Sequence, residues 1–203
     1  ILFGFAFPIW AERVNDVPDT RDAETVRVIA QQYAWNIHYP GPDGRFGTTR
    51  IDLVDEQDNP IGLDRSSEFA EDDFTTINQL HIPVNRKIRV DLSSKDVIHN
   101  FKLPELRVSQ DAIPGMVIPV HFTATSTSEE FLKTAVGTKR EGKGLEIACA
   151  QLCGLGHYRM KGYVTIHEED DYQAWLDEQA SYLEEEDGDD WGDDGDDWGD
   201  DDW

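Results

Sequence analysis

The chain has 203 residues and a formal charge of −24, with 42 acidic side chains against 18 basic ones. One domain with short extensions is the natural expectation for this length. The charge excludes nucleic acid as a partner, because phosphates are held by Lys and Arg. It favours a basic protein partner, whose approach such a charge would steer.

The N-terminal stretch "ILFGFAFPIW", residues 1–10, is almost wholly apolar. Ten residues are half of the roughly 20 that cross a bilayer as a helix. The stretch has no basic region and no small-residue cleavage site, so it is not a signal peptide. It either packs on the core or ends a transmembrane helix that begins upstream, with Trp10 at the interface. We favour the second interpretation, with residues 1–13 as the helix end and 14–25 as a linker.

Residues 26–168 read as a chain of short strands separated by turns. Val26–Tyr39 is rich in β-branched and aromatic residues and predicts one strand, and residues 40–44, "PGPDG", predict a turn. Residues 51–75 are acidic and irregular, and residues 80–92 alternate as two strands around Asn85 and Arg86. The remaining predicted strands cover residues 96–101, 117–124, 145–148 and 162–167. This pattern indicates a β-sandwich or β-barrel.

The C-terminal part predicts a helix and then an acidic tail. Residues 169–183 have apolar side chains near helical spacing and three acids at their start, where the helix dipole favours them. Residues 184–203 contain 13 acids and no base, which leaves −11 for the rest of the chain. Acidic low-complexity blocks are usually solvated tails. However, Trp191, Trp198 and Trp203 are of a residue type that anchors interfaces, so a recruiting role is the competing hypothesis.

The stretch "CAQLCGLGHYRM" holds the only two cysteines, Cys149 and Cys153, together with His157 and Met160. Thiolate, imidazole and thioether are the ligands that copper uses in electron transfer. His99, in "DVIHNF", is a second imidazole at a strand end. A mononuclear site of this kind needs only one cysteine. Two cysteines could instead bridge two coppers, each capped by one histidine, with Met160 and a backbone carbonyl as weak ligands.

Three other interpretations of this stretch compete with copper. Two Cys and two His also form a structural zinc set, but zinc has little use for Met160 and the spacing is unusual. A redox disulfide favours Cys-x-x-Cys, and a bridge between Cys149 and Cys153 would close a very small loop. Taken singly, each residue is more often structural. The other histidines are expected to be strand or surface residues: His38, His81, His121 and His167.

The motif "CAQLCGLGHYRM", preceded by "DVIHNFKLPELRVSQDAIPGM", resembles subunit II of the haem–copper cytochrome c oxidases, in its CuA domain. The resemblance covers nearly everything but the tail. It implies a mainly β, cupredoxin-like Greek-key barrel over residues 26–168, held outside the membrane by transmembrane helices. Residues 1–10 would then match the end of the second helix. The implied ligands of a binuclear copper centre are His99, Cys149, the Gln151 carbonyl, Cys153, His157 and Met160.

Two departures from the family pattern change what the resemblance implies. The family usually has Glu at the position of Gln151, where the side chain helps to hold magnesium against subunit I. An amide is a poorer ligand for a hard cation, which argues against the magnesium site but leaves the copper unaffected. The aromatic residue that accepts electrons is usually Trp, whereas this chain has Tyr33, with Trp35 two residues on. On one alternating strand both would face the same side.

The resemblance implies the electron-accepting subunit of a respiratory oxidase. Cytochrome c, or an attached haem domain, would give one electron at a time to the copper. Haem in subunit I would then reduce oxygen to water with proton transport, so this chain would hold no oxygen site. The implied location is the plasma or inner mitochondrial membrane, with the domain on the extracytoplasmic side. The alternatives are a free copper electron carrier or the CuA domain of a nitrous-oxide-reductase-like enzyme. The tail could contact a neighbouring respiratory complex.

Overall fold

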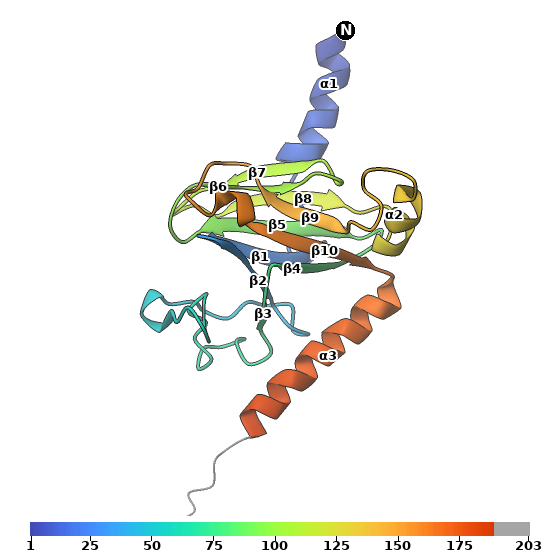
Figure 1. The fold of residues 1–203 in the computed structure, drawn as a ribbon. Coiled ribbons are helices and arrows are strands. Elements are labelled where there is room, and N and C mark those ends of the chain that lie inside the picture. Colours follow the sequence, from blue (N-terminus) through green and yellow to red (C-terminus); the bar gives the residue numbers. More distant parts are fainter. Residues whose placement is uncertain (189–203) are drawn as a thin grey trace, which may run out of the picture.

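The computed structural model describes residues 1–188. It begins with helix α1 (Leu2–Trp10), which continues as the π-helical turn η1 (Ala11–Asn15) and stands away from the body (Figure 1). The predicted linker therefore starts inside this helical segment, and the first strand begins at Glu24. The apolar side chains of α1 are all exposed. Within residues 1–188, no helix combines the length and the apolarity that crossing a membrane requires.

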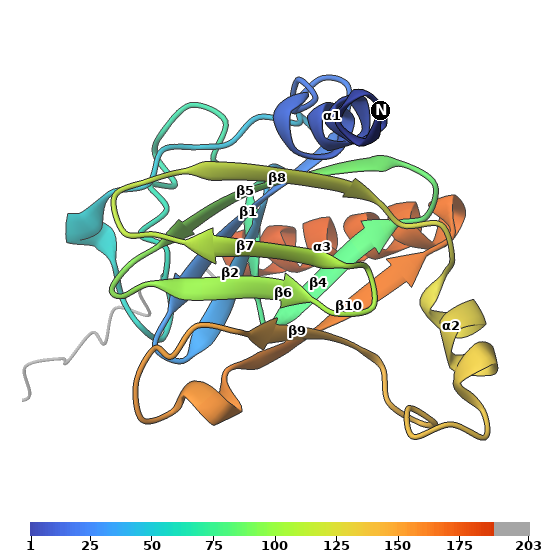
Figure 2. The ribbon, with the colours of Figure 1, turned by 90° about the horizontal axis from the view of Figure 1, so that it is seen from above.

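The body consists of two five-stranded sheets that face each other (Figures 1 and 2). The first has the order β3-β2-β1-β5-β8, with bounds β1 (Glu24–Gln31), β2 (Ala34–Tyr39), β3 (Phe74–Ile77), β5 (Lys87–Ser94) and β8 (Ile118–Thr123). The second has the order β4-β10-β9-β6-β7, with bounds β4 (Gln79–Pro83), β6 (His99–Leu103), β7 (Val108–Ala112), β9 (Leu145–Cys149) and β10 (Lys161–His167). Only β1–β5 and β4–β10 pair in parallel. The predicted mainly β fold is confirmed.

Strand alternation places the core between the two sheets. On β1 the inward side chains are Val26, Val28 and Ala30, all fully buried, and the partner strand β5 contributes a matching buried row. From the second sheet, residues such as Leu80 and Ile147 complete one apolar cluster. Burial of this apolar area is the main source of stability. The core therefore gives the ends of β6 and β9 a rigid base.

The prediction of one strand over Val26–Tyr39 is wrong, because the segment forms the hairpin of β1 and β2. Gln31 pairs with Ala34, so Gln32 and Tyr33 are the two turn residues. Tight hairpin turns usually carry Gly or Asn, and none occurs here. Instead, the backbone N–H of Gln32 donates to the Asp96 carboxylate at 2.6 Å. A partner 64 residues away thus holds a turn that has no local signal.

Three further elements were not predicted: β3, β7 and helix α2 (Ser128–Ala135). Helix α2 begins with a capping box, in which Thr127 and Glu130 each accept a hydrogen bond from the other's backbone N–H. The sequence "TSEE" carries this signal. Strand β7 is mostly polar and pairs along the edge of its sheet, so its sequence has little apolar alternation.

Helix α3 (Glu169–Gly188) follows the second sheet, starts where it was predicted and runs five residues further (Figure 1). Its Trp175 stacks on the ring of His81 with centroids 4.2 Å apart. His81 Nδ1 and His167 Nε2 lie 2.8 Å apart, and Tyr172 packs beside them. This cluster fastens α3 to β4 and β10. The acidic residues beyond 188, with all three tail tryptophans, lie outside the described residues.

The histidine–aromatic cluster under α3 makes stability depend on pH. Burial and the neighbouring His167 lower the pKa of His81 to about 4, and burial lowers the pKa of His167. Since the unfolded state then binds more protons, the stabilisation is complete above about pH 6.5 and decreases as the pH falls toward 4. We expect the free energy of unfolding in urea to fall by about 1–2 kcal/mol between pH 7 and 5, after discounting for partial exposure.

The control for this expectation is the double variant His81→Phe/His167→Phe, which keeps aromatic rings against Trp175 but removes both titrating groups. Its unfolding free energy should change less over the same pH interval. An equal pH dependence in both proteins would mean that other groups are responsible.

Candidate metal centre

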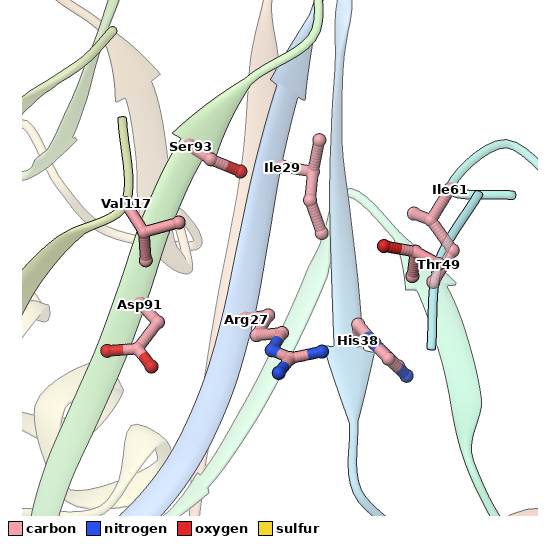
Figure 3. A pocket seen from close by; sticks show the side chains of 8 residues that line it. All are labelled: Arg27, Ile29, His38, Thr49, Ile61, Asp91, Ser93 and Val117. Carbon is pink, nitrogen blue, oxygen red and sulfur yellow. The ribbon is translucent and has the colours of Figure 1, made fainter. Parts of the chain in front are cut away.

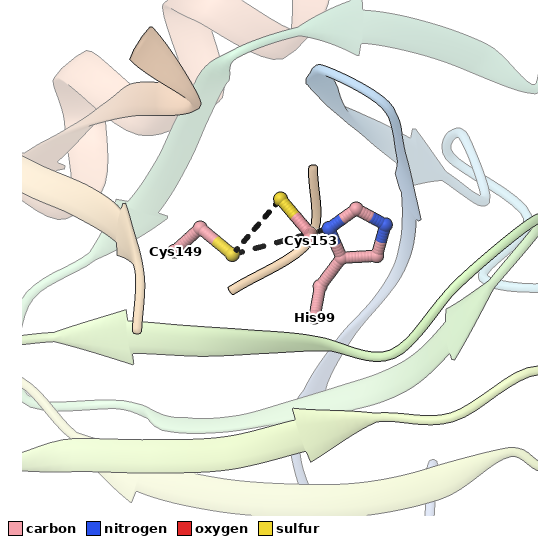
Figure 4. A group of neighbouring side chains, drawn as sticks. All are labelled: His99, Cys149 and Cys153. Carbon is pink, nitrogen blue, oxygen red and sulfur yellow. Dashed lines mark hydrogen bonds between the residues drawn. The ribbon is translucent and has the colours of Figure 1, made fainter. Parts of the chain in front are cut away.

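The candidate metal ligands come from the end of β9 and the β9–β10 loop of the second sheet and from the first residue of the neighbouring strand β6. Cys149 is the last residue of β9, and Met160 immediately precedes β10. Between them the loop includes Cys153 and the 3₁₀ turn η3 (His157–Arg159). His99 is the first residue of β6, which pairs with β9. Sheet pairing therefore brings His99 to the loop, as Figure 4 shows for His99 and the two cysteines.

The sulfur atoms form the middle of the cluster. Cys149 Sγ and Cys153 Sγ are 3.8 Å apart, and both thiols are free. Cys153 Sγ also lies 3.8 Å from Met160 Sδ. Cys153 and Met160 are buried, while Cys149 is partly exposed. The side with Cys149 is consequently the accessible one.

The two imidazoles lie nearest to different cysteine sulfur atoms of this pair. His99 Nδ1 lies 3.1 Å from Met160 Sδ and 3.9 Å from Cys149 Sγ. His157 Nδ1 lies 3.6 Å from Cys153 Sγ. The Gln151 carbonyl is 3.1 Å from Cys149 Sγ, and the Gln151 side chain is exposed. All six residues predicted as ligands thus meet in one group, which has the soft donors that copper prefers.

Asp96 fixes the orientation of His99. Its carboxylate lies 2.8 Å from His99 Nε2, so that nitrogen donates to Asp96 and Nδ1 faces the sulfur atoms. A carboxylate behind a metal-bound histidine is the usual way to set its tautomer. Asp111, the other acidic residue near the motif, accepts from the Asn100 amide at 2.7 Å. Asp96 therefore has a positioning role, whereas Asp111 joins β6 and β7.

The site shifts the pKa values of its groups in opposite directions. Burial alone would raise the pKa of Cys149, but hydrogen bonds from His99 and from the backbone at Asn100 and Gln151 lower it. Burial and the adjacent Cys149 raise the pKa of Cys153. Burial opposes a charge on His99, yet Cys149 and Asp96 raise its pKa. In the absence of metal, Cys149 is therefore the more readily ionised of the two thiols. The ionised form, the thiolate, is the form that binds metal.

The turn residues Gln32 and Tyr33 pack against the β9–β10 loop that carries the candidate ligands. The Gln32 amide donates to the Cys153 carbonyl at 2.5 Å. A Cβ atom at Gly156 would lie 2.5 Å from the Tyr33 ring, and one at Gly154, which has φ +134°, would lie 2.6 Å from the Tyr33 hydroxyl. Both glycines are therefore required by the close approach of Tyr33. Sequence reasoning missed Gln32, because its partners lie 64 and 121 residues away.

Tyr33 and Trp35 occupy different environments, so the expectation that they face one way along a single strand is wrong. Tyr33 lies in the turn and is partly exposed. Trp35 is fully buried on β2, with its ring edge-on to His99 at 6.2 Å and to Phe101 at 5.5 Å between centroids. Only Tyr33 can touch a partner protein, while Trp35 packs behind the candidate ligand His99.

The four remaining histidines lie on strands, as expected: His38, His81, His121 and His167. His38 is fully buried on the outer face of the first sheet, and its Nε2 is 2.7 Å from the buried Asp73 carboxylate. It borders a cavity of about 410 Å³ with Arg27 and Asp91 (Figure 3). Among residues 1–188, the one group of three or more His, Cys or acidic residues close enough to hold a metal is His99, Cys149 and Cys153.

Comparison with known proteins gives the family of the chain. The family model "Cytochrome C oxidase subunit II, periplasmic domain" matches residues 24–166. The alternative cytochrome c oxidase subunit 2 of Bradyrhizobium diazoefficiens is 36% identical over 175 residues, covering 86% of this chain and 56% of that protein. Cytochrome c oxidase subunit 2 of Cereibacter sphaeroides is 29% identical, over 76% of this chain and 48% of that protein.

Solved structures show the same fold. The periplasmic domain of subunit II of the cytochrome oxidase of Bradyrhizobium japonicum has a TM-score of 0.52 and 26% identity, covering 82% of this chain and 99% of that one. A mixed disulfide intermediate between a thioredoxin-like protein and subunit II of cytochrome c oxidase has a TM-score of 0.50 and 26% identity, covering 83% of this chain and 96% of that one. This chain spans about half the length of the curated relatives it matches.

Proposed function

Because the chain belongs to the cytochrome c oxidase subunit II family, we propose that it accepts electrons at a binuclear copper centre and passes them to the haem of subunit I. The observation that supports this proposal is a cluster of six donor groups: two thiols, two imidazoles, a thioether and a backbone carbonyl. The donor set fits copper, because soft sulfur ligands and imidazole are what copper selects.

In this proposal Cys149 and Cys153 would hold the two coppers as thiolates, His99 and His157 would add one imidazole each, and Met160 and the Gln151 carbonyl would be weak ligands. When bound, the pair of coppers supplies a one-electron carrier whose charge is shared between two metals. The chain's own contribution is rigidity. Asp96 holds His99 at 2.8 Å, and the Gln32 amide holds the Cys153 carbonyl. Fixed ligands change little when the electron arrives, which favours fast transfer.

Tyr33 is the proposed point at which electrons from the donor protein enter this chain, with Trp35 as the second candidate. It is partly exposed, it packs on the metal loop at Gly154 and Gly156, and it is two residues from Trp35. Trp35 contacts the His99 ring and supports the ligand from the core side. A cytochrome c, or an attached haem domain, is the proposed donor. The acidic charge of the chain suits a basic donor.

The proposed setting is an oxidase complex in the bacterial plasma membrane or the inner mitochondrial membrane. The family model describes a periplasmic domain, which supports an extracytoplasmic location for this domain. The exposed apolar helix α1 is the proposed end of a membrane anchor, with Trp10 at the interface. Subunit I and other oxidase subunits are the proposed partners. A magnesium ion at Gln151 is not part of the proposal, since an amide replaces the expected carboxylate.

Copper loading requires reduced cysteines, and we propose that a thioredoxin-like protein keeps them reduced. The two sulfur atoms are 3.8 Å apart, so a disulfide needs only a small movement. Cys149 is partly exposed and Cys153 is buried, which makes Cys149 the thiol that a partner can reach. A mixed disulfide with a thioredoxin-like protein is the state solved for the subunit II relative.

The test is copper content together with electron paramagnetic resonance on the full chain after reduction and copper loading. We expect two coppers per chain and one unpaired electron shared equally by both nuclei. One copper with a mononuclear signal, or preferential binding of zinc, would overturn the ligand assignment. Copurification with a multi-helix haem protein separates the oxidase subunit from a free electron carrier, since a free carrier would purify alone.

A further inference from the structure

A groove of about 710 Å³ opens where the N-terminal helical segment meets the body. Its walls come from η1, the start of β5, the turn between β6 and β7, and β8. We call it the helix-foot groove. Its charged lining residues are Glu12, Arg13, Asp16, Lys87, Glu105 and Arg107. The size is within the usual range for small-ligand sites.

The three cations of the helix-foot groove are unpaired. Among residues 1–188, the side chains of Arg13, Lys87 and Arg107 make no ion pair or hydrogen bond. In contrast, Arg86 bridges two carboxylates and Lys95 binds Glu56. Three unpaired cations in one groove are unexpected in a chain with 42 acids. Such a group is suited to an anionic ligand, and phosphate is the anion that Arg and Lys bind best.

Two of the three carboxylates that line the groove are free to bind a ligand. Glu105 is paired with Arg140, outside the groove. Asp16 accepts one hydrogen bond, from the Asn15 amide, and Glu12 has no partner within the described part of the chain. Three free cations therefore face two available carboxylates. This mixture suits a ligand that carries a phosphate and also a hydrogen-bonding cation.

His121 on β8 gives a second sign that a polar ligand belongs in the groove. Its Nε2 is buried and has no hydrogen-bond partner within residues 1–188. Burial, Lys87 and Arg13 lower its pKa, while Asp16 raises it, and all three charged residues line the same groove as His121. A buried polar atom without a partner is costly, and a ligand oxygen would satisfy it.

The position of the groove indicates where the ligand comes from. The groove is lined by residues of η1, which directly follows α1. Helix α1 stands away from the body (Figure 1), and its exposed side chains are apolar and aromatic. If α1 ends a membrane helix, Trp10 lies at the lipid–water interface and the groove faces the headgroups. We propose that the helix-foot groove binds a phosphatidylethanolamine headgroup, with its phosphate on Arg13, Lys87 and Arg107 and its ammonium on Glu12 and Asp16. This inference rests on the proposed membrane attachment.

The experiment uses the assembled oxidase, purified in detergent and incubated in turn with phosphatidylethanolamine, phosphatidylcholine and phosphatidylglycerol. Native mass spectrometry then measures the lipid retained. We expect phosphatidylethanolamine to be retained best, because phosphatidylcholine cannot donate hydrogen bonds to Glu12 and phosphatidylglycerol has no ammonium. Lys87→Gln/Arg107→Gln should weaken retention about 30-fold, since each cation near a lipid phosphate contributes roughly a factor of five.

The matched control is Lys139→Gln/Lys143→Gln, which removes the same charge from an exposed loop whose lysines have no ion pair among residues 1–188. Unchanged lipid retention in Lys87→Gln/Arg107→Gln, or equal retention of the three lipids, would overturn the proposal.

Lost association with subunit I at unchanged lipid retention would assign the groove to a protein partner. The His121 nuclear magnetic resonance signal is then followed during titration with inorganic phosphate and with phosphoethanolamine. Equal shifts of this signal with the two compounds would assign the groove to free anions. Copper resonance on the same samples tests the proposed function separately, because these residues are remote from the ligands.

Discussion

Replacing Cys153 with serine is expected to remove the proposed binuclear centre while leaving the fold intact. Cys153 Sγ contacts three of the five other candidate donors: Cys149 Sγ at 3.8 Å, His157 Nδ1 at 3.6 Å and Met160 Sδ at 3.8 Å. Serine has nearly the same volume, but its hydroxyl is a poor ligand for a soft metal. The chain should then bind at most one copper.

Activity should fall with the loss of the second proposed bridging ligand. Changes to groups behind metal ligands typically cost 10–100-fold, so losing this ligand should lower the turnover of the assembled oxidase by more than about 100-fold. The measurements are the copper-to-chain ratio, the paramagnetic resonance spectrum and turnover of the assembled oxidase. Met160→Leu is the graded comparison, because it removes only a proposed weak ligand and keeps the volume. It should retain two coppers with a shifted reduction potential.

A Cys153→Ser protein that still bound two coppers sharing one electron would contradict the bridging role. If Met160→Leu lost copper as completely as Cys153→Ser, the thioether would be a principal ligand. Circular dichroism melting of each variant separates both outcomes from unfolding, since neither change alters the buried volume by much.

The candidate ligands could be predicted because most of them are close in the sequence. Five of the six lie within the twelve residues from Cys149 to Met160, with Gln151 between the cysteines. Only His99 is distant, and β6–β9 pairing brings it to the loop. The chemistry of the donors, two thiols with an imidazole and a thioether, therefore pointed to copper without a structure.

The supports of the site could not be predicted, because they depend on contacts between distant segments. Gln32 reaches Asp96 and the Cys153 carbonyl, and neither contact has a sequence pattern. The hairpin at Gln32 and Tyr33 has no turn residues of the usual type, so the segment read as one strand. Helix α2, in contrast, has a local sequence signal, because Thr127 and Glu130 form a capping box at its start.

The packing of Tyr33 on the metal loop leads to the second large effect, which is expected for Gly156→Ala. The φ of Gly156 is −87°, so alanine is compatible with the backbone there. The steric problem is the added Cβ, which would lie 2.5 Å from Tyr33 Cδ2 and 2.7 Å from its Cγ. An aromatic ring held in a turn cannot move away freely, so His157 and the loop must shift. Overpacking of this kind costs about 1–3 kcal/mol.

Because the loop carries His157, this strain should weaken copper binding by about 5–150-fold, the range that 1–3 kcal/mol corresponds to. Competition titration against a copper chelator measures it. Gly144→Ala is the matched control, since a Cβ there has nothing within 4 Å and affinity should not change.

Adding Tyr33→Ala to Gly156→Ala should restore copper affinity, because it removes the atoms that clash. If Gly156→Ala bound copper like the unaltered chain, Tyr33 would not constrain the loop. If the double variant stayed weak, the defect would arise from the backbone at Gly156 and not from the Tyr33 ring.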